Sequence, residues 1–137
     1  MPSTHDSRPL LLWGPVILYM AVIFYVSSLH EAPLPAGMSD KSAHWLGYTG
    51  LSVTIVRALA GGLPRPIAAR TAMAAVLLAV AYGATDEFHQ MFVAGRSAEV
   101  MDLAADAFGA VAGAAACWAW GIISIRGRAR GPSRHEL

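Results

Sequence analysis

Residues 10–29 read LLLWGPVILYMAVIFYVSSL, a run of twenty residues without a charged side chain. A helix needs about 20 mainly apolar residues to cross a bilayer, so this run decides the fold class. It is longer than the apolar region of a secretory signal peptide, which spans about 7–15 residues. The stretch after it, Ser27–Ser28–Leu29–His30–Glu31, is a poor match to a cleavage site. We therefore expect a retained membrane span with its N-terminus in the cytoplasm.

Three further apolar segments follow this run, at residues 43–60, 67–85 and 103–125. The chain of 137 residues is 55% hydrophobic and only 14% charged, whereas a soluble domain carries about a quarter charged residues. Four spans of about 20 residues each use most of the chain. The sequence predicts an all-α membrane protein, a four-transmembrane-helix bundle over residues 10–125. A mobile N-terminal tail over residues 1–9 and a basic tail over residues 126–137 complete it.

The charged residues alternate in sign between the connections. Most basic residues lie before the first segment, between the second and third, or after the fourth: Arg8, Arg57, Arg65, Arg70, Arg126, Arg128, Arg130 and Arg134. Most acids lie in or beside the other two connections: Glu31, Asp40, Asp86, Glu87, Glu99, Asp102 and Asp106. Cytoplasmic loops carry the excess of Lys and Arg. We expect both termini in the cytoplasm and the polar cluster on the extracytoplasmic side.

The remaining composition excludes several classes of partner and cofactor. The only dense basic run directly follows a predicted span, which favours an anchor on anionic lipid over nucleic-acid binding. A single cysteine, Cys117, permits no intrachain disulfide or multi-cysteine metal site, and we expect it in the core. No nucleotide-binding loop is present, so we predict no organic cofactor, while a divalent metal stays open.

Helical spacing groups the polar residues on single faces. Lys41, His44, Tyr48 and Ser52 recur at steps of three and four, so they form one stripe that should face other helices. Ser39 and Asp40 precede this helix as N-cap candidates. In the last segment Asp102 and Asp106 share a face with Gly109-x-x-x-Gly113, a small-x-x-x-small packing motif.

The predicted topology brings three helix ends together at one side of the membrane. Charged groups at membrane depth need partners or hydration, so this set should form a defined site. Its members are Asp40, Lys41, His44, Tyr48, Tyr82, Asp86, Glu87, His89, Gln90, Arg96, Asp102 and Asp106. We assign no role to His5, His30 and His135.

Several interpretations of this set stay open at the level of sequence. In the first, Lys41, Gln90 and Arg96 bind substrate, with the two cations on a phosphate. His44 with Asp86 or Glu87 then supplies acid/base catalysis, Asp102 orients Arg96, and the supporting residues are Asp40, Asp102, Asp106, Tyr48 and Tyr82. In the second, a zinc, magnesium or calcium ion binds the set His44, Asp86, Glu87 and Asp102. A structural clamp of ion pairs and a proton- or ion-coupled pathway are the other two.

Four motifs together resemble the VanZ-like family over residues 10–125. They are Asp40-Lys41-x-x-His44, Tyr82-x-x-x-Asp86-Glu87-x-x-Gln90, Gly95-Arg96-Ser97 and Asp102-x-x-x-Asp106-x-x-Gly109-x-x-x-Gly113. The resemblance implies a small bacterial integral membrane protein of the cytoplasmic (inner) membrane. The founding member is associated with low-level teicoplanin resistance without a change in peptidoglycan precursor termini. Asp106 departs from the family pattern, where we expect asparagine, and adds to the surplus of acids.

The resemblance and the topology together predict a function at the cell envelope. We expect the extracytoplasmic cluster to bind or modify an envelope lipid or lipid-linked precursor, with membrane lipids as partners and a link to glycopeptide resistance. The alternative is a non-enzymatic membrane module in which the cluster is a structural clamp or a partner-binding surface. The sequence assigns no reaction and no oligomeric state.

Overall fold

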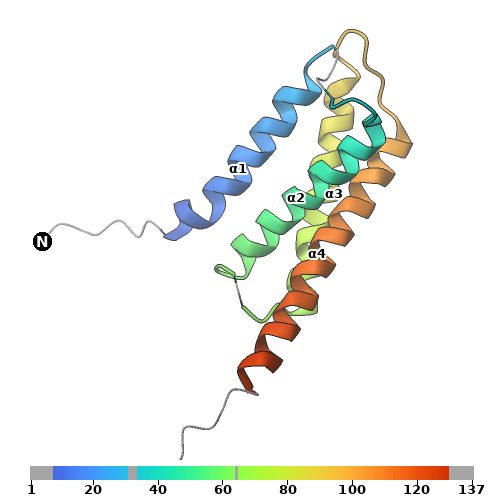
Figure 1. Ribbon diagram of the computed structural model, residues 1–137. Coiled ribbons are helices and arrows are strands. Elements are labelled where there is room, and N and C mark those ends of the chain that lie inside the picture. Colours follow the sequence, from blue (N-terminus) through green and yellow to red (C-terminus); the bar gives the residue numbers. More distant parts are fainter. Residues whose placement is uncertain (1–7, 31–33, 64, 130–137) are drawn as a thin grey trace, which may run out of the picture.

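The computed structural model describes residues 8–30, 34–63 and 65–129, with side chains to residue 123 (Figure 1). Regular secondary structure in these residues consists of four α-helices: α1 Arg8–Ser27, α2 Asp40–Leu59, α3 Ala69–Gln90 and α4 Val100–Ala129. Each predicted apolar segment is therefore a helix. Of the two predicted tails, residues 1–7 and 130–137 lie outside the described residues. Arg8 and Pro9 open α1, and α4 continues past residue 125.

Two of the helices are long and apolar enough to cross a membrane, α1 and the Val100–Ile123 part of α4. Helices α2 and α3 carry more polar residues, and they supply most of the buried polar groups described below. The prediction of four helices is confirmed, and membrane crossing by each of them stays a prediction.

Helices α2, α3 and α4 pack together, and α1 lies against α2 and α3 (Figure 1). The last turns of α1 and α3 and the first turns of α2 and α4 lie at one end of the bundle, which we call the polar end. The most extensive helix–helix contact joins α2 and α4. Gly109 and Gly113 of α4 lie directly on the backbone of α2, at Trp45 and Thr49. This confirms that the small-residue motif is a packing face.

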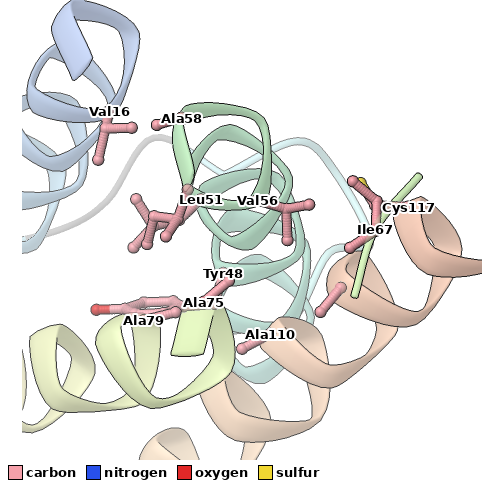
Figure 2. Packing of buried hydrophobic residues seen from close by; sticks show 12 residues of the cluster. Val16, Tyr48, Leu51, Val56, Ala58, Ile67, Ala75, Ala79, Ala110 and Cys117 are labelled. Carbon is pink, nitrogen blue, oxygen red and sulfur yellow. The ribbon is translucent and has the colours of Figure 1, made fainter. Parts of the chain in front are cut away.

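The core forms where the larger side chains of α2 meet the alanines of α3 and α4 (Figure 2). Tyr48, Leu51 and Val56 are fully buried among small residues, including Ala75, Ala79, Ala110 and Ala114. Cys117 is buried there too, as predicted. The predicted polar stripe of α2 also faces inward, since Ser52 is buried and its hydroxyl donates to Ala110 O at 2.8 Å.

Local hydrogen bonds define how α2 begins at the polar end. The Ser39 hydroxyl accepts from the Ser42 N–H at 3.2 Å, which confirms the predicted N-cap and places Asp40 in the first turn. His30 Nδ1 lies 2.6 Å from Ala94 O and joins the α1–α2 connection to the α3–α4 loop. The ring packs on Gly95, whose φ of +79° is accessible to glycine.

Helix α1 is the least buried element of the bundle. Its buried residues are Val16 and Ser27. The Tyr82 hydroxyl donates to Met20 O at 2.6 Å and ties α1 to α3. Many of its large apolar side chains are exposed, namely Leu10, Leu11, Ile17, Leu18, Val22, Phe24 and Tyr25. Exposed apolar surfaces of this size mark sites of contact with a membrane or with another protein.

Candidate functional site

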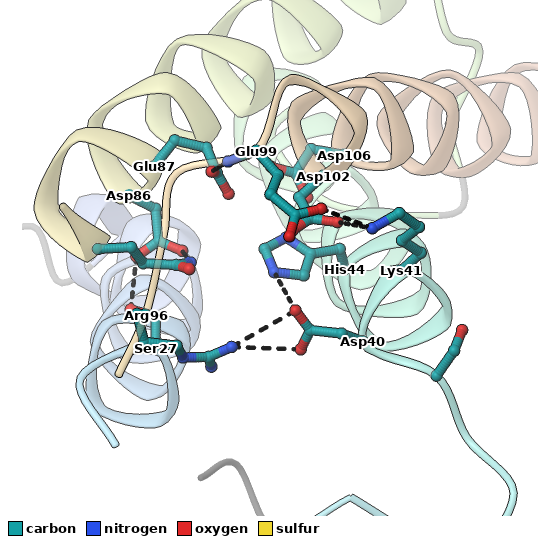
Figure 3. Close-up of polar contacts among 12 residues, drawn as sticks. Ser27, Asp40, Lys41, His44, Asp86, Glu87, Arg96, Glu99, Asp102 and Asp106 are labelled. Atoms are coloured by element: carbon teal, nitrogen blue, oxygen red, sulfur yellow. Dashed lines mark hydrogen bonds and ion pairs between the residues drawn. The ribbon is translucent and has the colours of Figure 1, made fainter. Parts of the chain in front are cut away.

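The polar end gathers charged side chains from three helices and one loop (Figure 3). Asp40, Lys41 and His44 come from the start of α2, and Asp86 and Glu87 from the end of α3. Asp102 and Asp106 come from the start of α4, and Arg96 from the loop between α3 and α4. Four carboxylates in this set are buried, with exposed fractions of 3% for Asp86, 7% for Glu87, 2% for Asp102 and 0% for Asp106.

His44 pairs with Asp106, a carboxylate predicted as a supporting residue. Its Nδ1 lies 2.9 Å from Asp106 Oδ1, and its Nε2 lies 4.0 Å from Asp40 Oδ2. The imidazole lies parallel to the Tyr48 ring, with centroids 6.4 Å apart. Asp106, rather than Asp86 or Glu87, therefore orients the predicted acid/base histidine.

Asp86 is held by neighbours on both sides. It accepts from the Ser27 hydroxyl at 2.6 Å and from Gln90 Nε2 at 3.3 Å. Gln90 is only 1% exposed, and its side-chain amide supports Asp86. Ser27 was not predicted, because a serine at the end of an apolar run gives no signal that it will reach a carboxylate 59 residues away.

Arg96 has a different partner from the one expected. Its Nη1 lies 3.4 Å from both carboxylate oxygens of Asp40, whereas Asp102 pairs with Lys41 at 3.2 Å. The expectation that Asp102 orients Arg96 is wrong, because the loop carries Arg96 to the α1 side of α2. The Arg96 side chain is 13% exposed. Its Nε is buried and has no hydrogen-bond partner among the described residues.

Lys41 links the starts of α2 and α4 at the rim of the bundle. It contacts Glu99 at 2.9 Å as well as Asp102, and Lys41 and Glu99 are both 49% exposed. The hydrogen bonds to Glu99 and Asp102 raise the pKa of Lys41. The exposed pair with Glu99 contributes little stability. This part of the site matches the predicted clamp, and Glu99, which belongs to it, was missed.

Glu87 is a buried carboxylate with one oxygen bound and one free. Its Oε2 accepts the backbone N–H of Glu99 at 2.8 Å. Its Oε1 has no hydrogen-bond partner within the described part of the chain. Burial raises the pKa of Glu87, which lies beyond the apolar segment at residues 67–85.

A pocket of about 210 Å³ lies between α1, α2 and α3 at the polar end. Its polar lining is Asp40, His44, Asp86 and Arg96, together with the hydroxyl-bearing Ser27, Tyr19 and Tyr48. Its other wall is apolar and comes from α1, through Val22, Ile23 and Val26. Of the predicted substrate-binding residues, Arg96 lines this pocket, whereas Lys41 and Gln90 are not among its lining residues. The arrangement suits an amphiphilic ligand, because charged and apolar walls share one space.

Two groups of side chains have the spacing of a metal site. His44, Glu87 and Asp106 offer ligand atoms within 4.8 Å of one another, as do Asp40, His44 and Asp102. Of the predicted metal ligands, only Asp86 belongs to neither group. Tyr82, predicted as a supporting residue, packs on Tyr48 with ring centroids 6.3 Å apart.

Comparison with known proteins identifies the family. No curated protein and no solved structure matches the chain. A family model described as VanZ/LLP1 matches residues 12–123. The match runs from α1 into α4 and includes every side chain of the polar end described above. The chain therefore belongs to the VanZ/LLP1 family.

Proposed function

We propose that this chain is a multi-pass protein of the bacterial cytoplasmic membrane whose polar end faces the extracytoplasmic side. Family membership and the two apolar helices support a membrane location. Large exposed apolar side chains on α3 and α4, such as Leu77, Phe108 and Trp120, favour contact with lipid rather than water. The basic residues Arg57 and Arg65 lie at the end opposite the acids, which the positive-inside rule assigns to the cytoplasm.

Cysteine accessibility tests this orientation. In a Cys117→Ala background we expect a membrane-impermeant maleimide to label Ser97→Cys in intact spheroplasts, because residue 97 is exposed at the polar end. Leu63→Cys, in the connection at the opposite end, should be labelled only after permeabilisation. The reverse pattern would place the polar end in the cytoplasm and refute the proposed orientation.

Within this topology we propose that the pocket binds a cell-envelope lipid, with its polar head at Arg96 and its apolar chain along α1. One observation carries this proposal. The buried Nε of Arg96 is unpartnered among the described residues, and Arg96 lines a pocket whose opposite wall is apolar. A guanidinium presents Nε and Nη donors in a planar fork that matches phosphate oxygens. Asp40 engages only Nη1, so the fork keeps donors for a ligand.

The other charged residues of the pocket restrict which lipid head groups can bind there. Asp40 and Asp86 bring two carboxylates to the lining beside one guanidinium. A head with only negative charge would meet repulsion from both acids. A head that combines a phosphate with hydroxyl or ammonium donors satisfies both kinds of wall. Zwitterionic phospholipids and lipid-linked sugars have this combination.

The chain offers a pair of variants that block the pocket in different ways. Gly47 lines the pocket, and a Cβ built there meets nothing within 4 Å. Gly47→Leu therefore fills the pocket without a backbone clash, while Arg96→Gln removes the charged fork. Gly14→Leu is the matched control for added bulk, since Gly14 lies outside this pocket and also has open space. Arg70→Gln controls for the loss of a charge.

Native mass spectrometry in mild detergent measures the outcome. The probes are phosphatidylethanolamine, phosphatidylglycerol and a long-chain polyprenyl phosphate, each titrated separately. We expect one retained lipid per chain. Retention by Arg96→Gln should be about tenfold or more weaker, because a charged hydrogen bond is lost. Retention by Gly47→Leu should fall at least as much, because its side chain fills the pocket. The two controls should bind as the unmodified chain does. Equal retention by Gly47→Leu would show that lipid lies elsewhere.

Modification of the bound lipid is a second candidate function. His44 lines the pocket and is oriented by Asp106, an arrangement in which an imidazole acts as a general acid or base. The clamp alternative is supported by the contacts of Lys41 with Glu99 and Asp102, which lie outside the pocket lining.

A further inference from the structure

Three buried oxygen atoms next to the lipid pocket lack hydrogen-bond partners among the described residues. They are Tyr48 Oη, Glu87 Oε1 and Asp106 Oδ2, one from each of α2, α3 and α4. The exposed fractions of these residues are 1%, 7% and 0%. Buried polar groups in folded proteins almost always have a partner. Three unpartnered oxygens from packed neighbouring helices therefore point to a ligand that all three helices share.

The geometry around these atoms is that of a cation site. His44, Glu87 and Asp106 place a nitrogen and two carboxylate oxygens within 4.8 Å of one another. Ligand atoms around tetrahedral zinc lie about 3.4 Å apart, given bond lengths of about 2.1 Å. An ion at this point would therefore draw the three side chains closer together. Gly83 makes the approach of α4 possible, because a Cβ there would lie 2.7 Å from Asp106 Oδ2 and 3.2 Å from Tyr48 Cε1.

The charge balance at this point also favours a cation. The two fixed positive charges of the polar end are engaged elsewhere, since Lys41 contacts Glu99 and Asp102 and Arg96 contacts Asp40. No lysine or arginine in the described residues forms an ion pair with Glu87 or Asp106. Two buried carboxylates are costly without a positive partner, and a divalent ion supplies two charges at once.

We propose that His44, Glu87 and Asp106 form a divalent-cation site at the inner side of the lipid pocket. A set of one imidazole and two carboxylates favours Zn²⁺ or Mn²⁺ over Ca²⁺, which takes six to eight oxygen ligands. Outer-shell groups of metal sites donate hydrogen bonds to ligand carboxylates, and we assign this role to the unpartnered Tyr48 hydroxyl. The second group, Asp40, His44 and Asp102, is less suited, because Arg96 and Lys41 already occupy its acids. The site does not require the lipid proposal to hold.

Metal content and zinc titration test the site directly. The protein is purified in mild detergent with a tag that lacks histidine, and its metals are measured by elemental mass spectrometry. We expect about one Zn²⁺ or Mn²⁺ per chain, and a lower thermal unfolding midpoint after chelation that Zn²⁺ or Mn²⁺ restores and Mg²⁺ or Ca²⁺ does not. The proposal is overturned if the purified protein holds no metal and its unfolding midpoint does not change on addition of Zn²⁺ or Mn²⁺. A shared proton would then be the partner of these oxygens.

Matched variants assign the metal to these side chains. Glu87→Gln and Asp106→Asn keep side-chain shape and should weaken Zn²⁺ binding about 100-fold or more. Glu99→Gln removes an exposed acid of the same end and should bind Zn²⁺ as the unmodified chain does. Full binding by both Glu87→Gln and Asp106→Asn would also overturn the proposal. X-ray absorption of the unmodified protein needs no variant, and it should show one imidazole among oxygen ligands.

The two proposals fail in different ways. Arg96→Gln and Gly47→Leu should lose lipid and keep the metal. Residue 87 lies outside the pocket lining, so Glu87→Gln should lose the metal and keep the lipid. Lipid binding and metal binding are therefore tested separately, and the failure of one proposal does not refute the other.

Discussion

Replacing Gly109 with leucine is expected to abolish the folded bundle. A Cβ at residue 109 would overlap the backbone carbonyl of Trp45 and come within 3.1 Å of Thr49 N. A clash with backbone cannot be relieved by rotating a side chain, so α2 and α4 would have to separate. Overpacking of this kind costs about 3 kcal/mol or more. Two measurements report the loss of folded protein. Fluorescence-detected size exclusion gives the yield of monodisperse protein, and SDS titration gives its free energy of unfolding.

The control for this experiment is a glycine on the facing helix. Gly47→Ala adds a methyl group where nothing lies within 4 Å, and alanine favours a helix over glycine by about 1 kcal/mol. This variant should be as stable as the unmodified chain or slightly more so. If Gly109→Leu unfolds at the same SDS fraction as Gly47→Ala, the close approach of α2 and α4 is refuted.

The second large effect is expected from Asp106→Leu. The side chain of Asp106 is fully buried, and its Oδ1 is the hydrogen-bond partner of His44 Nδ1. The His44 side chain is itself only 9% exposed, so water cannot replace the lost acceptor fully. Removing one partner of a buried pair costs about 3 kcal/mol. We expect a loss of that order in the free energy of unfolding, measured with a chelator present so that bound metal does not contribute.

Asp106→Asn separates the hydrogen bond from the charge. Asparagine keeps an acceptor oxygen for His44 and removes the negative charge, so it should retain most of the stability that leucine loses. If asparagine and leucine destabilise the bundle equally, the His44 hydrogen bond does not hold α2 and α4 together.

The helices and their inward faces were predictable because they depend on spacing within one segment. The i, i+3 and i+4 recurrence of Tyr48 and Ser52, and of Asp106 and Gly109, fixes which residues share a face. The structure confirms both faces as buried. The start of α2 was predictable for the same reason, since Ser39 caps its own helix.

The pairings between helices were not predictable, because they depend on how each helix is rotated and on the path of a loop. Arg96 contacts Asp40 instead of Asp102, since the loop before α4 carries it across to the α1 side. Ser27 reaches Asp86 only because α1 docks beside α3. Neither contact leaves a signal in the composition or in the helical periodicity of the sequence. The sequence therefore predicted which residues belong to the site. It did not predict that some form an ion-pair clamp at the rim while others line a pocket.

The light packing of α1 has a consequence for how the protein assembles. Helix α1 is synthesised first, and it packs mainly against α2, the next helix along the chain. Tyr82 and Asp86, which hold the C-terminal half of α1, belong to α3 and follow later. The pocket between α1, α2 and α3 is therefore completed only after α3 and Arg96 have been synthesised.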